Sequence, residues 1–170
     1  EADAGVILLA DDLLRATGVE FTLQVGHLAP MKKVLSPLAP EVQARVMRFL
    51  DKRDFDGMEK YLSETGAGGW QAILDTLKHL TAVRETEDLW RLVGDIPERP
   101  RIEALGRILA KEGLSFSWNF AIARGLDYYT GMVFEGFAAN LGAENQILGG
   151  GEYRLAKLFG GDDVASSGFA

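Results

Sequence analysis

Hydrophobic residues near the start of the chain recur first at helical and then at strand spacing. Val6, Leu9 and Leu13 follow an acidic first turn, and Gly18 comes just after the last periodic residues, where helices commonly stop. Residues 21–25 alternate apolar and polar types and are rich in β-forming residues, which is typical of a strand with one buried face. The pattern therefore predicts a helix followed by a strand.

From about Pro30 to Gly113 the pattern is that of several short amphipathic helices, each bounded by Gly, Pro or Asp. Apolar stripes such as theirs are typical of helices that pack against other helices. The expected helices cover residues 41–52, 57–63, 69–80, 87–92 and 101–111.

Strand patterns return after Gly113. Residues 116–122 alternate large apolar residues with smaller ones, which predicts a half-buried antiparallel strand. Further strands are expected at residues 132–137 and 146–148. A helix is expected at residues 153–159, where two glycines follow as a stop signal.

These elements predict an α+β fold: an antiparallel sheet with flanking helices and a mostly helical insertion between strands. Charge supports a division into three parts, because residues 1–30 carry one basic and five acidic residues, whereas residues 31–112 carry fourteen of each. We expect the sheet to be built from residues 1–30 and 114–170, and the insertion from residues 31–113.

Composition narrows the class of protein. Hydrophobic residues make up 47% of the 170 residues and charged residues 25%, the balance of a soluble globular chain. No apolar run is long enough for a membrane span, and no cysteine is present for a disulfide, so we expect a cytoplasmic protein. The two histidines, His27 and His79, lie far apart in sequence, and we expect no metal held by side chains alone.

The net charge of -7 argues against an extended surface for phosphates, because nucleic-acid affinity rests largely on Lys and Arg. Any contact with RNA should therefore lie mostly outside these residues. The chain starts at Glu1 without an initiator Met and stops at Ala170, and we expect both ends to be cuts in a longer polypeptide.

Residues 124–135 carry the most chemistry. Arg124, Asp127, Tyr128 and Tyr129 stand at a junction between two expected strands, where polar groups and a tight turn can line a concave site. An Arg fork suits a phosphate or carboxylate, and a Tyr hydroxyl can bind a small polar ligand. In a regular strand only one of the two tyrosines would face a given pocket. Alternatively, the tyrosines fill the core and Arg124 pairs with Asp127.

Three glycines, Gly149, Gly150 and Gly151, follow the strand expected at residues 146–148. Glycines between a strand and a helix permit tight turns and close approach of a ligand. The triplet has neither the spacing nor the Lys of a P-loop, so by itself it predicts only a turn from strand to helix.

Both segments resemble the histidyl-tRNA synthetase family. Residues 124–135 are similar to its histidine-specific motif, and residues 149–153 with residues 158–161 resemble its second histidine motif. The last residues look like the start of class II motif 3. Bacterial members place Arg after the glycines and Asp after the Tyr, whereas this chain has Glu152 and Arg154 and resembles archaeal members.

The resemblance implies an enzyme that activates histidine with ATP and magnesium and transfers it to tRNA(His), as a homodimer when full length. It implies that Arg124 is the catalytic arginine, placed against the α-phosphate and the histidine carboxylate. Tyr128 and Tyr129 would line the histidine pocket, with Tyr129 facing the imidazole, and Gly149, Gly150 and Gly151 would form its floor.

Other parts of the family pattern are not found in the sequence: motif 1, motif 2, the end of motif 3 and the anticodon-binding domain. We therefore expect the isolated chain to be inactive. Residues 31–113 stand where the family carries an insertion that resembles a clamp on the tRNA acceptor stem, although their net charge is zero.

A second interpretation is the regulatory subunit of ATP phosphoribosyltransferase, a histidine-sensing relative without ligase activity. Gly26 and His27 also fit that subunit, whereas the nearly complete motif at residues 124–135 favours the synthetase.

Overall fold

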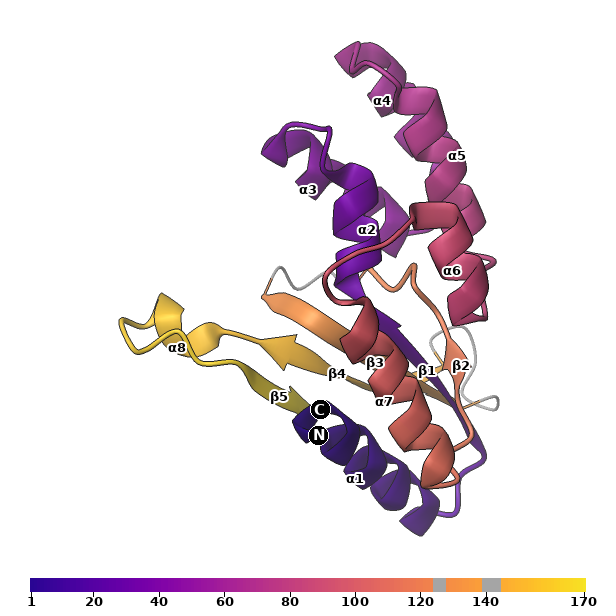
Figure 1. Ribbon diagram of the computed structural model, residues 1–170, viewed down its shortest axis with the longest axis vertical. Coiled ribbons are helices and arrows are strands. Elements are labelled where there is room, and N and C mark those ends of the chain that lie inside the picture. Colours follow the sequence, from indigo (N-terminus) through magenta and orange to yellow (C-terminus); the bar gives the residue numbers. More distant parts are fainter. Residues whose placement is uncertain (124–127, 139–144) are drawn as a thin grey trace.

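A five-stranded sheet forms the base of the protein in the computed structural model, which describes residues 1–123, 128–138 and 145–170 (Figure 1). The strand order is β2-β1-β3-β4-β5. Neighbouring strands are antiparallel except β1 and β2, which are parallel. The strands are β1 (Phe21–His27), β2 (Ser117–Trp118), β3 (Tyr129–Ala138), β4 (Gln146–Tyr153) and β5 (Ser166–Phe169).

Two helices, α1 (Ala2–Ala16) and α7 (Arg99–Lys111), lie side by side over one face of the sheet (Figure 1). Their apolar residues meet large buried side chains of the strands, among them Leu23 and Phe134. A polar contact fixes the two helices to the sheet. Arg101 of α7 donates to Asp3 of α1 and to the buried Glu152 of β4. We call this side of the sheet the covered face.

The remaining helices of the middle segment form a lobe above the sheet in Figure 1. Apolar residues bury each helix against its neighbours, which is why short helices of this kind are stable together. The lobe consists of α2 (Leu28–Leu35), α3 (Pro40–Asp51), α4 (Phe55–Thr65), α5 (Trp70–Leu80) and α6 (Thr86–Val93). Across the described residues, no helix is both long and apolar enough to cross a membrane.

The predicted α+β fold is confirmed, and the helices expected between residues 41 and 111 begin and end within two residues of α3 to α7. The boundaries of the insertion, expected at residues 31–113, stay a prediction. The helix α7, which we assigned to the insertion, packs on the sheet beside α1.

The strand expected at residues 116–122 was wrong in length and direction. Only Ser117 and Trp118 pair with β1, and they run parallel to it, because α7 carries the chain from the lobe back to the end of the sheet at which β1 begins (Figure 1). Asn119 then ends the strand: its side chain donates to Gln24 and accepts from the Ala121 amide.

The glycine triplet was also placed wrongly, since it lies inside β4 and not in a turn. Gly150 pairs with Phe134 of β3 on one side and Phe169 of β5 on the other, so hydrogen-bonded neighbours on both sides keep this segment extended. The following helix, α8 (Leu155–Leu158), is shorter than the expected residues 153–159.

Candidate functional site

The second face of the sheet, opposite α1 and α7, carries the candidate site. Gln24, Glu135 and Gly149 are paired across β1, β3 and β4, so they form one row on this face. The row beside it, Val25, Phe134 and Gly150, points to the covered face. Glu135 is only half-buried, whereas Phe134 is fully buried. We call the side bearing Glu135 the open face.

On the open face the ring of Tyr129 lies against bare glycine backbone. A Cβ atom added to Gly151 would stand 2.7 Å from Tyr129 Cδ1 and 2.5 Å from the Met132 carbonyl oxygen, so no side chain fits there without a shift. Tyr129 is buried, with 8% of its surface exposed. The glycine backbone beneath the Tyr129 ring therefore fixes the position of the ring.

Two more tyrosine rings extend this surface. The ring of Tyr128 lies 4.6 Å from that of Tyr129 and 6.0 Å from that of Tyr153, measured between centroids. A Cβ added to Gly168 would approach the Tyr153 hydroxyl to 3.0 Å. Three phenol rings, each in contact with a neighbour, thus border a strip of glycine backbone, and such a surface can contact a small polar ligand and present hydroxyls to it.

The structure therefore places the predicted site residues on two different faces of the sheet. Tyr128, Tyr129 and Gly151 come together, and Gly149 follows on the same face. Gly150 faces the other way: a Cβ added there would meet Phe134 Cε1, Phe169 Cβ and the Gly168 carbonyl oxygen, each at 2.6 Å. Only its backbone borders the open face.

Arg124 and Asp127 lie outside the described residues, so their pairing and the role of Arg124 stay predictions. The sequence reasoning missed Tyr153 and Gly168 as neighbours of the tyrosines. The signal that could have found Tyr153 is its pairing with Tyr129 across β3 and β4, which only the extended conformation of the triplet reveals.

Glu152, the departure from the bacterial motif, belongs to the covered face. Besides the contact with Arg101, its carboxylate accepts from Thr130 Oγ1 at 2.8 Å. The side chain is only 5% exposed. Its role here is to tie β3 and β4 to α7 and, through Arg101, to α1.

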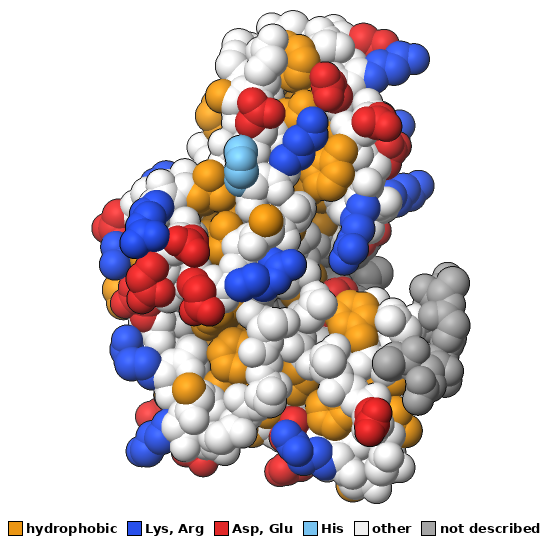
Figure 2. Space-filling view, turned by 90° about the vertical axis from the view of Figure 1, so that its right-hand side faces the viewer, with side chains coloured by type: hydrophobic (Ala, Val, Ile, Leu, Met, Phe, Trp, Pro, Cys, Tyr) orange, Lys and Arg blue, Asp and Glu red, His pale blue; other side chains and the backbone are white. Residues whose placement is uncertain are grey.

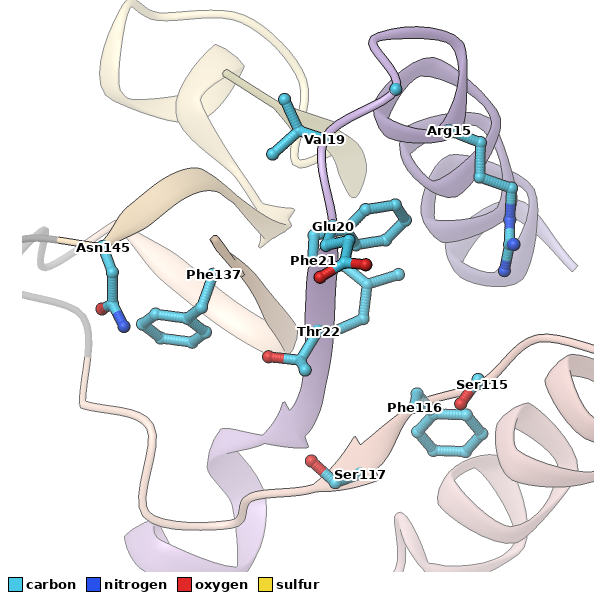
Figure 3. Close-up of a pocket in the computed structure, with 12 residues that line it drawn as sticks. Arg15, Val19, Glu20, Phe21, Thr22, Ser115, Phe116, Ser117, Phe137 and Asn145 are labelled. Atoms are coloured by element: carbon cyan, nitrogen blue, oxygen red, sulfur yellow. The ribbon is translucent and has the colours of Figure 1, made fainter. Parts of the chain in front are cut away.

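A cavity of about 1000 Å³ runs along β1 at the end far from the lobe (Figure 3). Phe21, Phe116 and Phe137 give it apolar walls, and Arg15 and Asn145 stand at its border. Next to the cavity, β2 pairs only with Gln24 and Val25 of β1, which leaves the start of β1 as an open edge. None of the site tyrosines lines it.

No group of three or more His, Asp or Glu side chains that could hold a metal ion is found among the residues that the structure describes.

Comparison with known proteins decides the family. The sequence model described as histidyl-tRNA synthetase matches residues 1–170. The chain belongs to the histidyl-tRNA synthetase family. The predicted resemblance is therefore confirmed.

Two histidine–tRNA ligases illustrate the match to this family. That of Methanoregula boonei is 59% identical over 170 residues, and that of Methanoculleus marisnigri is 56% identical over 169. In both cases 99% of this chain aligns with 40% of the relative. The chain thus spans about two fifths of the length of these curated relatives.

The fold is also that of the family. A solved structure described as an ATP phosphoribosyltransferase regulatory subunit/histidyl-tRNA synthetase from Bacillus halodurans C superimposes with a TM-score of 0.81 at 23% identity. The superposition covers 99% of this chain and 46% of that one.

Proposed function

We propose that the polypeptide containing this chain is a histidine–tRNA ligase, which converts histidine and ATP to histidyl-adenylate and pyrophosphate and then transfers the histidyl group to tRNA(His), releasing AMP. The observation that carries the proposal is the Tyr129 ring held over Gly151 on the open face of a chain of this family. A translation enzyme of this kind works in the cytoplasm.

The open face supports binding of free histidine. An imidazole is flat and polar, so it can stack against a phenol ring, and a Tyr129 hydroxyl can hydrogen-bond one of its nitrogens. Because Gly149 carries no side chain, the ligand can approach the β4 backbone closely at that residue. Tyr128, with its ring 4.6 Å from that of Tyr129, forms the adjoining wall.

Activation requires a positive group where charge develops on the α-phosphate. Arg124 comes four residues before Tyr128, and we propose it as the catalytic arginine, which would stabilise the transferred phosphate by electrostatics. Magnesium ions in such sites are held mostly by the nucleotide's phosphates with one or two carboxylates. Glu135 of β3 places one carboxylate on the open face.

The whole enzyme is proposed to be a homodimer. Leu9 and Leu13 of α1 expose 53% and 51% of their surface, which is suited to contact with further protein. Sedimentation of the full-length polypeptide tests this part: a dimer supports it, and a monomer at micromolar concentration contradicts it.

Histidine-dependent exchange of pyrophosphate into ATP tests the main proposal. We expect the full-length polypeptide to catalyse it with histidine alone among the amino acids. Arg124→Ala should slow it by about two to three orders of magnitude. If the wild type gives no exchange, the ligase assignment fails.

The regulatory subunit of ATP phosphoribosyltransferase is the second candidate, and Gly26 and His27 were its main support. In the structure both residues have local roles. A Cβ on Gly26 would collide with the Asn119 carbonyl oxygen, and His27 Nδ1 accepts from the Ala29 amide as the N-cap of α2. The pair therefore no longer favours a regulator, and the exchange assay separates the two candidates.

A further inference from the structure

A bulge interrupts β3 directly after Tyr129. Tyr129 and Val133 both pair with β4, and a single β4 residue, Glu152, separates their two partners. On β3 the same interval holds three residues, 130–132, where a regular antiparallel ladder would place one. A bulge bends its strand and changes the direction of neighbouring side chains, and bulges are common beside binding sites. The direction of the Tyr129 ring therefore depends on how this bulge is held.

The carboxylate of Glu152 holds two of these three residues. Its Oε1 accepts from Thr130 Oγ1 at 2.8 Å, and a Cβ atom added to Gly131 would stand 3.0 Å from the carboxylate. The second oxygen, Oε2, accepts from Arg101, so each oxygen has its own donor. Lys32 of α2 reaches the same segment and donates to the Thr130 carbonyl oxygen at 3.1 Å. Because the Lys32 side chain is exposed and its contact is correspondingly weak, the bulge is held mainly by Glu152.

Pairing with β1 leaves only a short part of the bulge able to shift. The ladder between β1 and β3 is unbroken along the whole of β1 and ends at Met132. The position of Met132 is therefore fixed by β1. Only Thr130 and Gly131 separate it from Tyr129, and both of them contact Glu152. A change at Glu152 is thus transmitted to Tyr129 through two residues of backbone.

The burial of Glu152 also indicates a role in geometry. Charged side chains are usually exposed, as the Lys, Arg, Asp and Glu side chains on the face drawn in Figure 2 are, whereas Glu152 is buried. Removing a carboxylate from water is costly unless its oxygens are hydrogen-bonded. An apolar residue of similar size would fill the layer beneath α7 at a lower cost. A buried carboxylate at this position is therefore suited to holding a particular arrangement of its partners.

We propose that Glu152 is a positioning residue for the histidine site. By holding Thr130 and Gly131 at the covered face, it fixes the direction of Tyr129 and its spacing from Tyr153 on the open face. Glu152 lies on the side of the sheet opposite the ligand, so it acts through the backbone of β3 and not by contact. The inference rests on the proposed ligase function and adds to it a residue that sets the affinity for histidine.

The main test compares Thr130→Val with Thr130→Ser in the full-length polypeptide. Valine keeps the shape of threonine but has no hydroxyl for Glu152, whereas serine keeps the hydroxyl. Replacing Thr130 leaves the buried pair of Glu152 and Arg101 intact, which avoids the misfolding expected from removal of the carboxylate itself. Gly131→Ala is a second variant, because its methyl group would press on the carboxylate from the other side.

Ile102→Val is the control for a general loss of stability. Ile102 is fully buried in α7, next in sequence to Arg101, and it has no polar contact with the bulge. Removing one of its methylene groups should lower the melting temperature without moving Tyr129. A variant that is merely less stable can thus be told apart from one in which the ring is misplaced.

Each variant is assayed for histidine-dependent pyrophosphate exchange, with separate KM values for histidine and for ATP. For Thr130→Val we expect the KM for histidine to rise about tenfold, because the ring that contacts the ligand is displaced, and the KM for ATP to stay within about twofold. Thr130→Ser should stay within about threefold of wild type for histidine. Gly131→Ala should act in the same direction as Thr130→Val, and Ile102→Val should leave both KM values within about twofold.

Two results would overturn the inference. The first is an unchanged KM for histidine in Thr130→Val, and the second is an equal rise in Thr130→Val and Ile102→Val, which would make the contact purely structural. Calorimetric titration of the same variants with histidine gives the affinity without the reaction. A wild type that binds histidine but gives no exchange would defeat the ligase proposal alone, so the two failures are distinguishable.

Discussion

The ring of Tyr129 lies so close to Gly151 that a Cβ atom added to the glycine would stand 2.7 Å from Tyr129 Cδ1. The added atom would also be 2.5 Å from the carbonyl oxygen of Met132, which is backbone and cannot rotate away. The position of the ring therefore depends on the absence of a side chain at residue 151.

Gly151→Ala should displace Tyr129 and weaken histidine binding. We expect the KM for histidine in pyrophosphate exchange to rise at least about tenfold, because misplacing a binding group by about 1 Å can cost two orders of magnitude. The control is Gly5→Ala in α1, where a Cβ meets nothing within 4 Å and should leave the KM unchanged. An unaltered KM in Gly151→Ala would remove the glycine strip from the site.

Tyr129→Phe tests the hydroxyl separately from the ring. The ring and its packing on Gly151 remain, so the fold should be retained while the KM for histidine rises about tenfold. Tyr128→Phe, in the adjoining wall, should have a smaller effect. Equal effects of the two variants would contradict the assignment of Tyr129 to the imidazole.

Gly150→Ala should act on stability, since its added methyl group would enter the covered face between Phe134 and Phe169. Overpacking of this kind costs about 1–3 kcal/mol in the free energy of unfolding. Urea unfolding measures the cost, which should exceed that of Gly5→Ala. A stable Gly150→Ala protein with impaired histidine binding would place this residue in the pocket floor after all.

Arg101→Ala should also destabilise the protein, because it leaves the buried carboxylates of Asp3 and Glu152 without their cation. The Arg101 side chain is 51% exposed, so solvent reduces the effect to about 1–2 kcal/mol. Arg91→Ala, which breaks an exposed pair with Asp88, is the control and should cost less than about 0.5 kcal/mol. Thermal and urea unfolding of both variants measure the difference.

His27 should make stability depend on pH. Burial, reinforced by the charge of Arg101, lowers the pKa of His27 from 6.5 to about 4. Because the unfolded state takes up the proton at higher pH, this residue's contribution is full above about pH 6.5 and is lost as the pH falls towards 4. The maximum loss is about 3 kcal/mol.

His27→Asn provides the check. Asn also caps helices, so α2 should remain capped while the dependence of unfolding free energy on pH between 6.5 and 4 becomes flatter. An identical pH profile in wild type and His27→Asn would show that other groups are responsible.

Elements with local patterns were predictable from the sequence. The helix expected at residues 41–52 is found at Pro40–Asp51, and the strand expected at residues 21–25 is found at Phe21–His27. Amphipathic spacing determines which side of a helix is buried, wherever its partners come from. The unexpected helix α2 starts directly at the end of β1, where His27 closes the strand and caps the helix.

Elements whose conformation depends on distant partners were not predictable. The glycine triplet is extended because β3 and β5 pair with it on both sides, and no signal within residues 149–151 indicates those partners. Likewise, β2 is parallel to β1 because α7 carries the chain from the lobe back to the end of the sheet at which β1 begins (Figure 1).

The sequence by itself determined the family, the α+β class and the presence of tyrosines and glycines suited to a small polar ligand, since these follow from residue identity and short-range spacing. Only the tertiary structure decided that Gly151 lies under Tyr129 while Gly150 faces Phe134. Strand register assigns every residue to one face or the other, and register is set by pairing between segments far apart in the chain.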